Sequence, residues 1–241
     1  MAQQKKKHIL SLAALGSAAM LVLIGSTMAF FTSTDSVTNR FAGSRVDITL
    51  TETKWDPETA QGVIPGDELD KNPQIINNED IDTYVFMRVT VPCDTQMIDN
   101  DNGTPLGGLG SDVPLYKFMT GDGNDPESFT YNDSFSAAQS VHSHWSLVNG
   151  DRGFTHYDSE GKKYIYVYAY TSGNELAPVR KGEATEPLFD KLHLWNFSES
   201  GYNENTDHSV RVEALGIQAD IAGHPADDIS GIWAILEGSG S

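Results

Sequence analysis

The feature that most constrains the fold is an alternation of side chains with a period of two in two distant stretches, residues 82–91 and 163–171. Successive side chains of an extended strand point to opposite faces of a sheet, so this alternation predicts two long strands. Shorter stretches of the same kind occupy residues 46–51, 188–197 and 208–221. Turn signals separate the stretches, and no alternation of strands with helices indicates a parallel sheet. The pattern therefore predicts an all-β, two-sheet antiparallel sandwich, and it leaves immunoglobulin-like and jelly-roll topologies open.

Local breaks in the pattern predict where strands end or bend. Pro92 follows the first long strand, and because proline has no N–H to donate, we expect it to end that strand or to lie near an edge. In the last strand the apolar phase changes between Val212 and Leu215, which predicts a β-bulge near Ala214. Residues 94–139 are rich in Asp, Asn, Gly and Ser, and we interpret them as one or two long loops around a short strand.

One helix is expected near the C-terminal end. Pro225 suits the first position of a helix, and Asp227 and Asp228 then fall in the first turn, where the helix dipole favours acidic side chains. The helix should end at Gly238. The residues that follow the first turn form one apolar stripe, which we expect to pack against the sandwich. They are Ile229, Ile232, Trp233 and Leu236.

The N-terminal residues have the composition of a signal peptide. Three lysines precede an apolar run of 16 residues from Ile9 to Ile24, and a short segment of mostly small residues ends at Ala29. A membrane-spanning helix needs about 20 apolar residues, more than this run contains. Because the run is also expected to be removed with the signal peptide, the mature form is expected not to span a membrane. The protein is therefore expected to be secreted. We divide the chain into a signal peptide (1–29), an N-terminal extension (30–43) and a β-sandwich domain with its C-terminal helix (44–237).

The net charge of the chain restricts the kinds of molecule that it is expected to bind. There are 34 acidic residues against 16 Lys and Arg, a formal net charge of −18. Such a charge repels nucleic acids and anionic membrane surfaces, so neither is an expected partner. Solubility outside the cell is the ordinary consequence, and binding of divalent cations by clustered carboxylates is the alternative. The single cysteine, Cys93, cannot form a disulfide within the chain, and we expect a free, partly buried thiol.

Metal-binding and catalytic signals in the sequence are weak. The sequence has no His-Glu-x-x-His, Gly-x-Ser-x-Gly or phosphate-loop pattern, so no catalytic or cofactor-binding residue is predicted. His142 and His144 lie two positions apart, so on a strand their imidazoles point the same way and, with His156 or a carboxylate, suit Zn²⁺. Because no third ligand stands at a diagnostic spacing, we favour exposed histidines on a solvent face. Residues 99–103 and 122–125 resemble calcium loops but depart from the full ligand register, so we favour turns.

The second long strand carries a stripe of tyrosines with two interpretations. Tyr164, Tyr166, Tyr168 and Tyr170 share one face of that strand. Aromatic side chains on an open face can line a carbohydrate groove. We favour core packing, in which the rings are buried and the hydroxyl groups reach the rim of the core.

A series of short sequence pieces spans the predicted cleavage point and the first strands. The pieces are Met28–Asp35, Val37–Gly43, Val46–Glu52, Trp55-Asp56, Pro65–Asp67, Lys71–Pro73, Asn77 and Tyr84–Val89. In this order and spacing they resemble the TasA/camelysin family of exported Gram-positive proteins. The likeness covers residues 5–92 well, is loose from 94 to 200, and returns in the last strand and the C-terminal helix. Precursors of this family are typically cut by a dedicated SipW-type signal peptidase, which the resemblance implies as a partner during export.

The resemblance implies a jelly-roll-like β-sandwich that forms biofilm fibres in the extracellular matrix or at the cell surface. In the best understood members, the N-terminal stretch of one subunit adds as a strand to the sandwich of the next. The corresponding donor segment here is Phe30–Phe41, with Phe30, Phe31, Val37 and Phe41 as anchoring side chains. The segment has β-friendly residues and few charges, and a head-to-tail strand addition propagates into a filament. A segment that folds back onto its own domain is the alternative.

Two other functions stay open. Some members of the family are named camelysin and described as metallopeptidases, which implies a surface enzyme that uses His142, His144 and a carboxylate. The sequence shows no recognisable metallopeptidase motif. The third function is a monomeric cell-surface adhesin that contacts its ligand through the Tyr164–Tyr170 face or the 94–139 loops. We expect a structural protein that self-associates into filaments, without catalysis, a cofactor or bound calcium or zinc.

Overall fold

The predicted signal peptide, and Phe30, Phe31 and Val37 of the predicted donor segment, lie outside the residues that the structure describes. The computed structural model describes residues 40–41, 46–56, 63–94, 98–99, 112–121, 137–197, 209–221 and 223–238.

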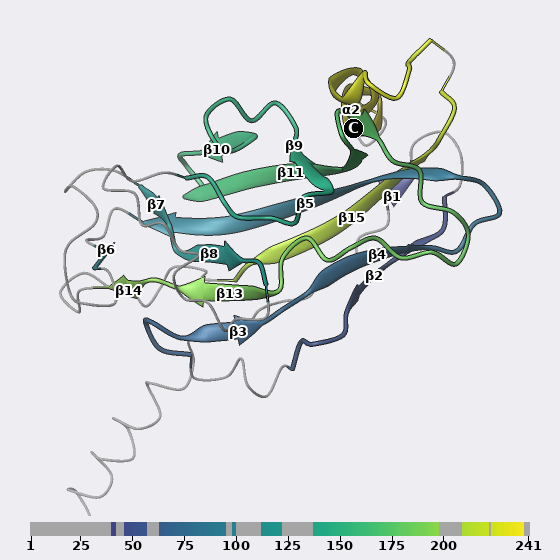
Figure 1. Cartoon of the computed structure of the whole chain (residues 1–241). Coiled ribbons are helices and arrows are strands. Elements are labelled where there is room, and N and C mark those ends of the chain that lie inside the picture. Colours follow the sequence, from purple (N-terminus) through teal and green to yellow (C-terminus); the bar gives the residue numbers. More distant parts are fainter. Residues whose placement is uncertain are drawn as a thin grey trace, which may run out of the picture.

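Strands dominate the described residues, and one α-helix lies near their C-terminal end (Figure 1). None of the helical structure among these residues is long and apolar enough to cross a membrane. In chain order the elements are β1 (Arg40–Phe41), β2 (Ile48–Glu52), β3 (Glu68–Asp70), β4 (Pro73–Asn77), β5 (Thr83–Asp94), β6 (Ile98–Asp99), β7 (Val113–Pro114), β8 (Tyr116–Met119), β9 (Trp145–Leu147), β10 (His156–Asp158), β11 (Lys163–Ser172), β12 (Glu175–Leu176), β13 (Lys191–Leu194), β14 (Asn196–Phe197), β15 (Arg211–Gln218) and α2 (Ile229–Gly238).

Two layers of sheet make up the fold. The larger sheet has the strand order β1-β15-β5-β11-β10, with β7, β9 and β12 paired at its margins. Its strands pair antiparallel, except that β1 runs parallel to β15. The sheets β3-β13-β8 and β2-β4 form the second layer, below the larger sheet in Figure 1. Many neighbouring strands are distant in sequence, because the chain crosses between the two layers. The predicted jelly-roll-like antiparallel β-sandwich with a short C-terminal helix is confirmed.

The main core fills the space between the layers. The inward-facing residues of the central strand β5 are fully buried: Val85, Met87, Val89 and Val91. The tyrosine stripe of β11 joins the same core, with Tyr164, Tyr166 and Tyr168 buried. The hydroxyl of Tyr166 donates a hydrogen bond of 2.7 Å to the Ala137 carbonyl. The stripe is therefore core packing and does not line an open groove.

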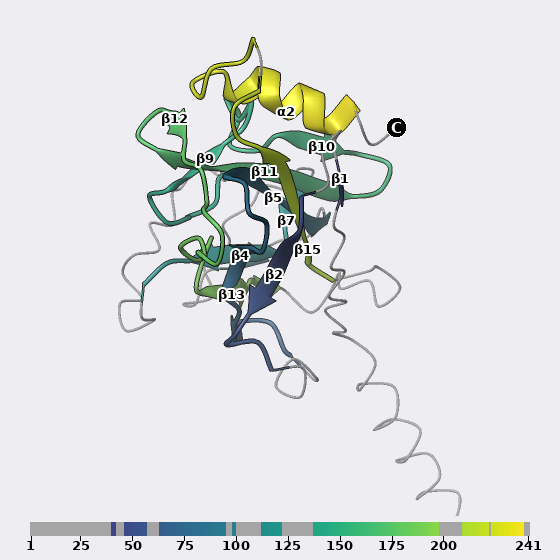
Figure 2. The ribbon, with the colours of Figure 1, turned by 90° about the vertical axis from the view of Figure 1, so that its right-hand side faces the viewer.

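The opposite face of the larger sheet carries a second core under α2. Tyr84 and Phe86 of β5 and Leu215 and Ile217 of β15 point to this face. Figure 2 shows α2 lying across the sheet. The predicted apolar stripe of the helix is the other half of this core, since Ile232, Trp233 and Leu236 are buried in it. Farther along β5 on the same face, Arg88 and Thr90 are only partly buried, so the helix covers one end of the face.

The predicted bulge near Ala214 is wrong. The β15–β5 register is continuous from Arg211 opposite Thr90 to Gln218 opposite Thr83. Val212 and Ala214 face the main core, whereas Leu215 and Ile217 face the second core. The apparent change of phase arises because both faces of this strand are covered, each at a different point.

Pro92 does not end its strand. β5 continues to Asp94, and Pro92 pairs with Lys163 of β11. On the other side, the last pair with β15 is already formed at Thr90. On that side the pairing partner then changes to β7, which pairs with Cys93 and Asp94, and the Leu115 N–H donates to the Pro92 carbonyl at 2.8 Å. The missing N–H therefore falls at a change of pairing partner, where proline interrupts no continuous ladder.

The helix begins later than its sequence signals predict. Pro225 and Asp228 form a turn, in which the Asp228 N–H donates to the Pro225 carbonyl at 2.9 Å, and α2 starts at Ile229. Asp228 caps the helix, because its Oδ1 accepts a hydrogen bond of 3.1 Å from the Gly231 N–H. His224 Nδ1 lies 2.7 Å from the other oxygen of Asp228.

Candidate functional site

β15 is fully paired on one side only. β5 pairs with all of its residues from Arg211 to Gln218. On the other side, the described residues pair only with Leu215 and Gly216. An edge strand with open N–H and C=O groups accepts a further strand from another segment or another chain. The outer edge of β15 is therefore a candidate strand-acceptor site.

The strand that lies on this edge comes from the predicted donor segment. Arg40 pairs with Leu215 and Phe41 with Gly216, and the two strands run parallel. Phe41, one of the four predicted anchors, is thus placed against the larger sheet of its own chain. The other three anchors lie outside the described residues. The structure therefore pairs the end of the predicted donor segment with this candidate edge within one chain, which is also the arrangement that the alternative of a segment folding back onto its own domain expects.

Gly216 lets this edge pack closely on the second layer. A Cβ atom at Gly216 would lie 3.1 Å from Cδ1 of Ile48 on β2 and 3.3 Å from Cγ2 of Thr83. Both distances are tighter than ordinary van der Waals contact, so the small residue permits the close approach of β2. Packing against β2 therefore holds the backbone of β15 in place at this edge.

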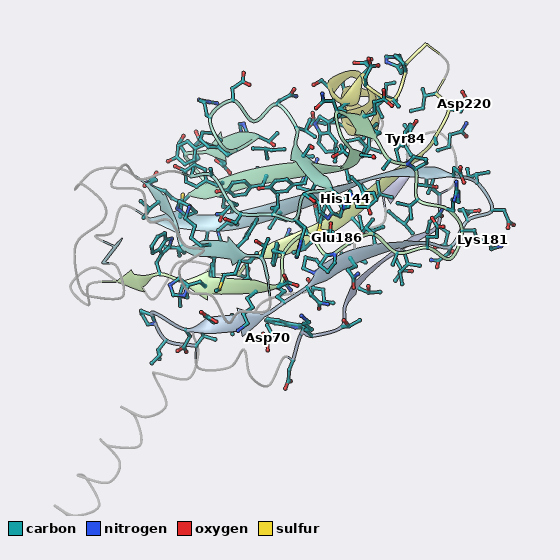
Figure 3. The ribbon with its side chains drawn as sticks, in the orientation of Figure 1. Asp70, Tyr84, His144, Lys181, Glu186 and Asp220 are labelled. Atoms are coloured by element: carbon teal, nitrogen blue, oxygen red, sulfur yellow. The ribbon has the colours of Figure 1, made fainter. Side chains whose placement is uncertain are left out.

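The two candidate metal ligands do not share a strand, so that prediction is wrong. Both lie in one turn, which is closed by a hydrogen bond of 3.0 Å from the Trp145 N–H to the His142 carbonyl, and β9 begins only at Trp145. The two imidazoles nevertheless meet one carboxylate. Nδ1 of His144 lies 2.7 Å from one oxygen of Glu186, and Nδ1 of His142 lies 3.5 Å from the other. Figure 3 shows His144 beside Glu186.

A second carboxylate completes this histidine cluster. Nε2 of His142 lies 2.8 Å from Oδ2 of Asp190, which also accepts a hydrogen bond of 2.8 Å from the Gly121 N–H. The Trp145 indole N–H donates to the Glu186 carbonyl at 3.1 Å. These contacts fasten the turn before β9 to the segment before β13, which is a structural role.

The described ranges contain no group of three or more His, Cys, Asp or Glu side chains arranged to hold a metal ion. His156 lies on β10, apart from the cluster of His142 and His144. Of the two calcium-like segments, 99–103 and 122–125, the structure describes only the backbone of Asp99. Cys93 is fully buried in the main core and forms no disulfide. The side chain of His144 is 52% exposed, which agrees with the prediction of exposed histidines. The side chain of His142 is only 23% exposed, so the prediction fits it less well.

Two charged pairs of the structure were not predicted from the sequence. Lys71 and Glu52 form a buried ion pair of 2.6 Å within the second layer, between the segment that joins β3 to β4 and the end of β2. Arg88 of β5 and Glu213 of β15 are directly opposite each other. They lie on the sheet face that carries α2, beyond the part that the helix covers. A signal for the second pair was present, since Arg88 and Thr90 interrupt the apolar residues on one face of their strand.

Comparisons with known proteins gave no match. No protein-family model, no curated protein and no solved structure matches this chain.

Proposed function

We propose that this chain is a secreted structural protein, the subunit of an extracellular matrix or cell-surface fibre that assembles by strand addition and catalyses no reaction. The observation that carries the proposal is the pairing of Arg40 and Phe41 with the half-open edge of β15. The resemblance of the sequence to the TasA/camelysin family agrees with it. The acceptor is the outer edge of β15, and the donor is Phe30–Phe41.

The contact between the donor segment and this edge suits exchange between chains. Two residue pairs supply few hydrogen bonds, each worth about 0.5–1.5 kcal/mol net, so the contact within one chain is weak. The same segment fits the same edge of a second copy. Because donor and acceptor are different surfaces, the contact repeats head to tail without closing. A strand of this polarity that extends beyond Arg40 in the N-terminal direction runs beside the open edge of Arg211–Ala214.

Deletion of residues 30–41 from the secreted protein tests the donor assignment. We expect the intact protein to form filaments visible by electron microscopy and the shortened protein to stay monomeric, because it has no strand to add. A peptide of residues 30–41 should shorten the filaments of the intact protein by occupying free edges. A peptide of the same composition in scrambled order is the control. Filaments of the shortened protein contradict the assignment.

A surface metallopeptidase is the second candidate, since Glu186 supplies a carboxylate that both His142 and His144 approach. Stoichiometric zinc binding, and casein cleavage that is abolished by a chelator and by His144→Ala, would support it. Cleavage of casein by the zinc-loaded protein would also contradict the non-catalytic proposal. A monomeric adhesin is distinguished by size-exclusion chromatography over a series of concentrations, in which the elution volume should not change.

A further inference from the structure

The outer face of the larger sheet carries a cavity beside the proposed acceptor strand β15. Its volume is about 670 Å³, and it lies between α2 and the segment that leads into β10. Figure 1 shows α2 above the larger sheet, of which β10 is an edge strand. The floor belongs to β15, β5 and β11, where the helix leaves the sheet uncovered. Neutral floor residues include Thr90, Ile165 and Val167, while Trp233 and Glu237 belong to α2 and Asn149 to the opposite wall.

Two arginines line this cavity in an otherwise acidic chain. In the register of the sheet, Arg211 lies opposite Thr90, and Glu213 lies opposite Arg88. Arg88 and Arg211 are thus diagonal neighbours on one face, a spacing of roughly 7–8 Å that long side chains bridge easily. Both guanidinium groups can therefore reach one ligand group in the cavity.

Arg88 has hydrogen-bonding capacity that the described residues do not use. Its side chain is only 17% exposed, and its Nη1 donates one long hydrogen bond of 3.4 Å to Glu213. Its Nη2 lies 4.0 Å from Glu237, beyond hydrogen-bond distance, and its guanidinium carbon lies 5.4 Å from the Trp233 ring. A guanidinium carries five N–H groups in a fixed fork. Most of these donors are available to a ligand or to water in the cavity.

Arg211 stands at the rim of the same cavity. It is exposed, and within the described part of the chain no carboxylate forms an ion pair with it. His156 lines the cavity from β10, in the same cross-strand row as Arg211, Thr90 and Ile165. The rim therefore attracts an anionic group, because a planar guanidinium fork binds a carboxylate through two parallel hydrogen bonds.

The size and the acidic groups of the cavity restrict the ligand further. A volume of about 670 Å³ falls within the range of small-molecule sites and far exceeds the need of an inorganic anion. Glu213 and Glu237 repel a ligand with several negative charges, but their oxygens accept hydrogen bonds from hydroxyl groups. Thr90 and Asn149 add neutral polar groups. These features suit a ligand with one carboxylate on a hydroxyl-rich body.

We propose that the cavity between α2 and β10 binds a uronic acid unit, the monoanionic sugar of acidic polysaccharides, with its carboxylate on Arg211 and Arg88. The sugar ring lies over Ile165 and Val167, and its hydroxyl groups face Glu213, Thr90 and Asn149. This site gives the protein a polysaccharide partner. The site adjoins the proposed acceptor edge, because Arg211 and Glu213 belong to β15, but its ligand would contact side chains on the sheet face and no backbone group of that edge.

Titration of the secreted protein with sodium glucuronate tests the proposal. Trp233 lines the cavity, so tryptophan fluorescence reports binding, and calorimetry confirms the stoichiometry. For a ligand of this size we expect a roughly millimolar Kd. Glucose and inorganic phosphate are the comparison probes, and each should bind at least about tenfold more weakly, because one lacks the charge and the other the hydroxyl-rich body. Equal binding of phosphate identifies a simple anion site and overturns the assignment.

Three variants place the ligand. Arg211→Gln should weaken glucuronate binding about tenfold or more, because it removes a charge-assisted contact. Arg88→Lys keeps the ion pair with Glu213 but loses the planar fork, and it should weaken binding as well. Arg180→Gln, at an exposed arginine beside Glu183, is the matched control and should leave the Kd unchanged. Wild-type affinity of Arg211→Gln, or no binding by the wild type, would refute the site.

Discussion

Lys71 is the most unusual single residue in the described part of the molecule, because its cationic side chain is fully buried. Its Nζ lies 2.6 Å from Oε2 of Glu52 and 4.2 Å above the Trp55 ring. A charge in such a place is tolerated only with a partner, and an aromatic face adds a cation–π contribution. The pair therefore fixes the position of the β2 end against the segment between β3 and β4.

Removal of one partner of this pair should be strongly destabilising. Lys71→Ala leaves the Glu52 carboxylate buried without its cation, and we expect a loss of about 3–5 kcal/mol in the free energy of unfolding, measured by urea denaturation. Lys71→Met combined with Glu52→Leu should recover most of that loss. Lys191→Ala, at an exposed pair with Glu68, is the control and should cost at most about 1 kcal/mol. A loss for Lys71→Ala as small as that of the control contradicts the role of the pair.

Lys117 should make stability depend on pH. Burial lowers the pKa of its side chain from the ordinary value of 10.5 to about 8. Between pH 8 and pH 10.5 the unfolded chain binds more protons at this site than the folded chain does, so the free energy of unfolding should rise with pH in that window. Below pH 8 both states are protonated, and this contribution should be constant.

Lys117→Met removes the titrating group and provides the comparison. Denaturation midpoints of the two proteins between pH 7 and pH 10 should converge as the pH rises if the variant is the more stable at neutral pH. The tyrosines of the main core act in the opposite direction at higher pH, because burial raises the pKa of Tyr166 and Tyr168. A stability difference between wild type and variant that is constant with pH contradicts the assignment.

At the scale of elements, local pattern predicts strands well and pairing poorly. β5 and β11 were predictable because their alternation is regular on both faces. Their neighbours were not, because tertiary packing selects β15 as the second partner of β5 across more than a hundred residues of chain. The strand geometry considered for His142 and His144 is not formed for a related reason, since both residues lie in a turn that is anchored on Glu186.

The candidate sites were accessible to sequence reasoning only in part. The proposed donor segment was predicted from its composition and from resemblance, but nothing local marks the outer edge of β15 as the proposed acceptor. The proposed sugar-binding cavity combines Arg88, Arg211 and Asn149 from three distant segments. Only the sheet register brings the two arginines onto one face, so the sequence alone could not group them.

Gly216 offers a test of how tightly β15 and β2 fit together. Gly216→Ala places a methyl group 3.1 Å from Cδ1 of Ile48, and overpacking of this kind should cost about 1–3 kcal/mol of unfolding free energy. Ile48→Val removes that nearest carbon atom. In a double-mutant cycle the combination should therefore cost less than the sum of the single losses. Simple additivity of the two changes would show that the glycine does not owe its small size to Ile48.

At the scale of the whole molecule, the net charge of −18 opposes self-association. In the proposed filament, identical subunits would repel one another during growth, and the repulsion extends over a Debye length of about 10 Å at 0.1 M salt. The proposed strand contact is a pairing of backbone groups, which salt screens little. Growth should therefore be limited by charge at low ionic strength.

Salt should act in opposite directions on the two proposed activities. Raising NaCl from about 0.05 M to 0.5 M shortens the Debye length roughly threefold, so filament growth should accelerate as repulsion between subunits is screened. The same change should weaken glucuronate binding, because the contact between its carboxylate and the exposed Arg211 is screened. Light scattering follows growth, and fluorescence titration follows binding, with sucrose at equal osmolarity as the control for non-ionic effects. If salt slows growth, ion pairs between subunits dominate assembly, and strand addition by an apolar segment is not its main driving force.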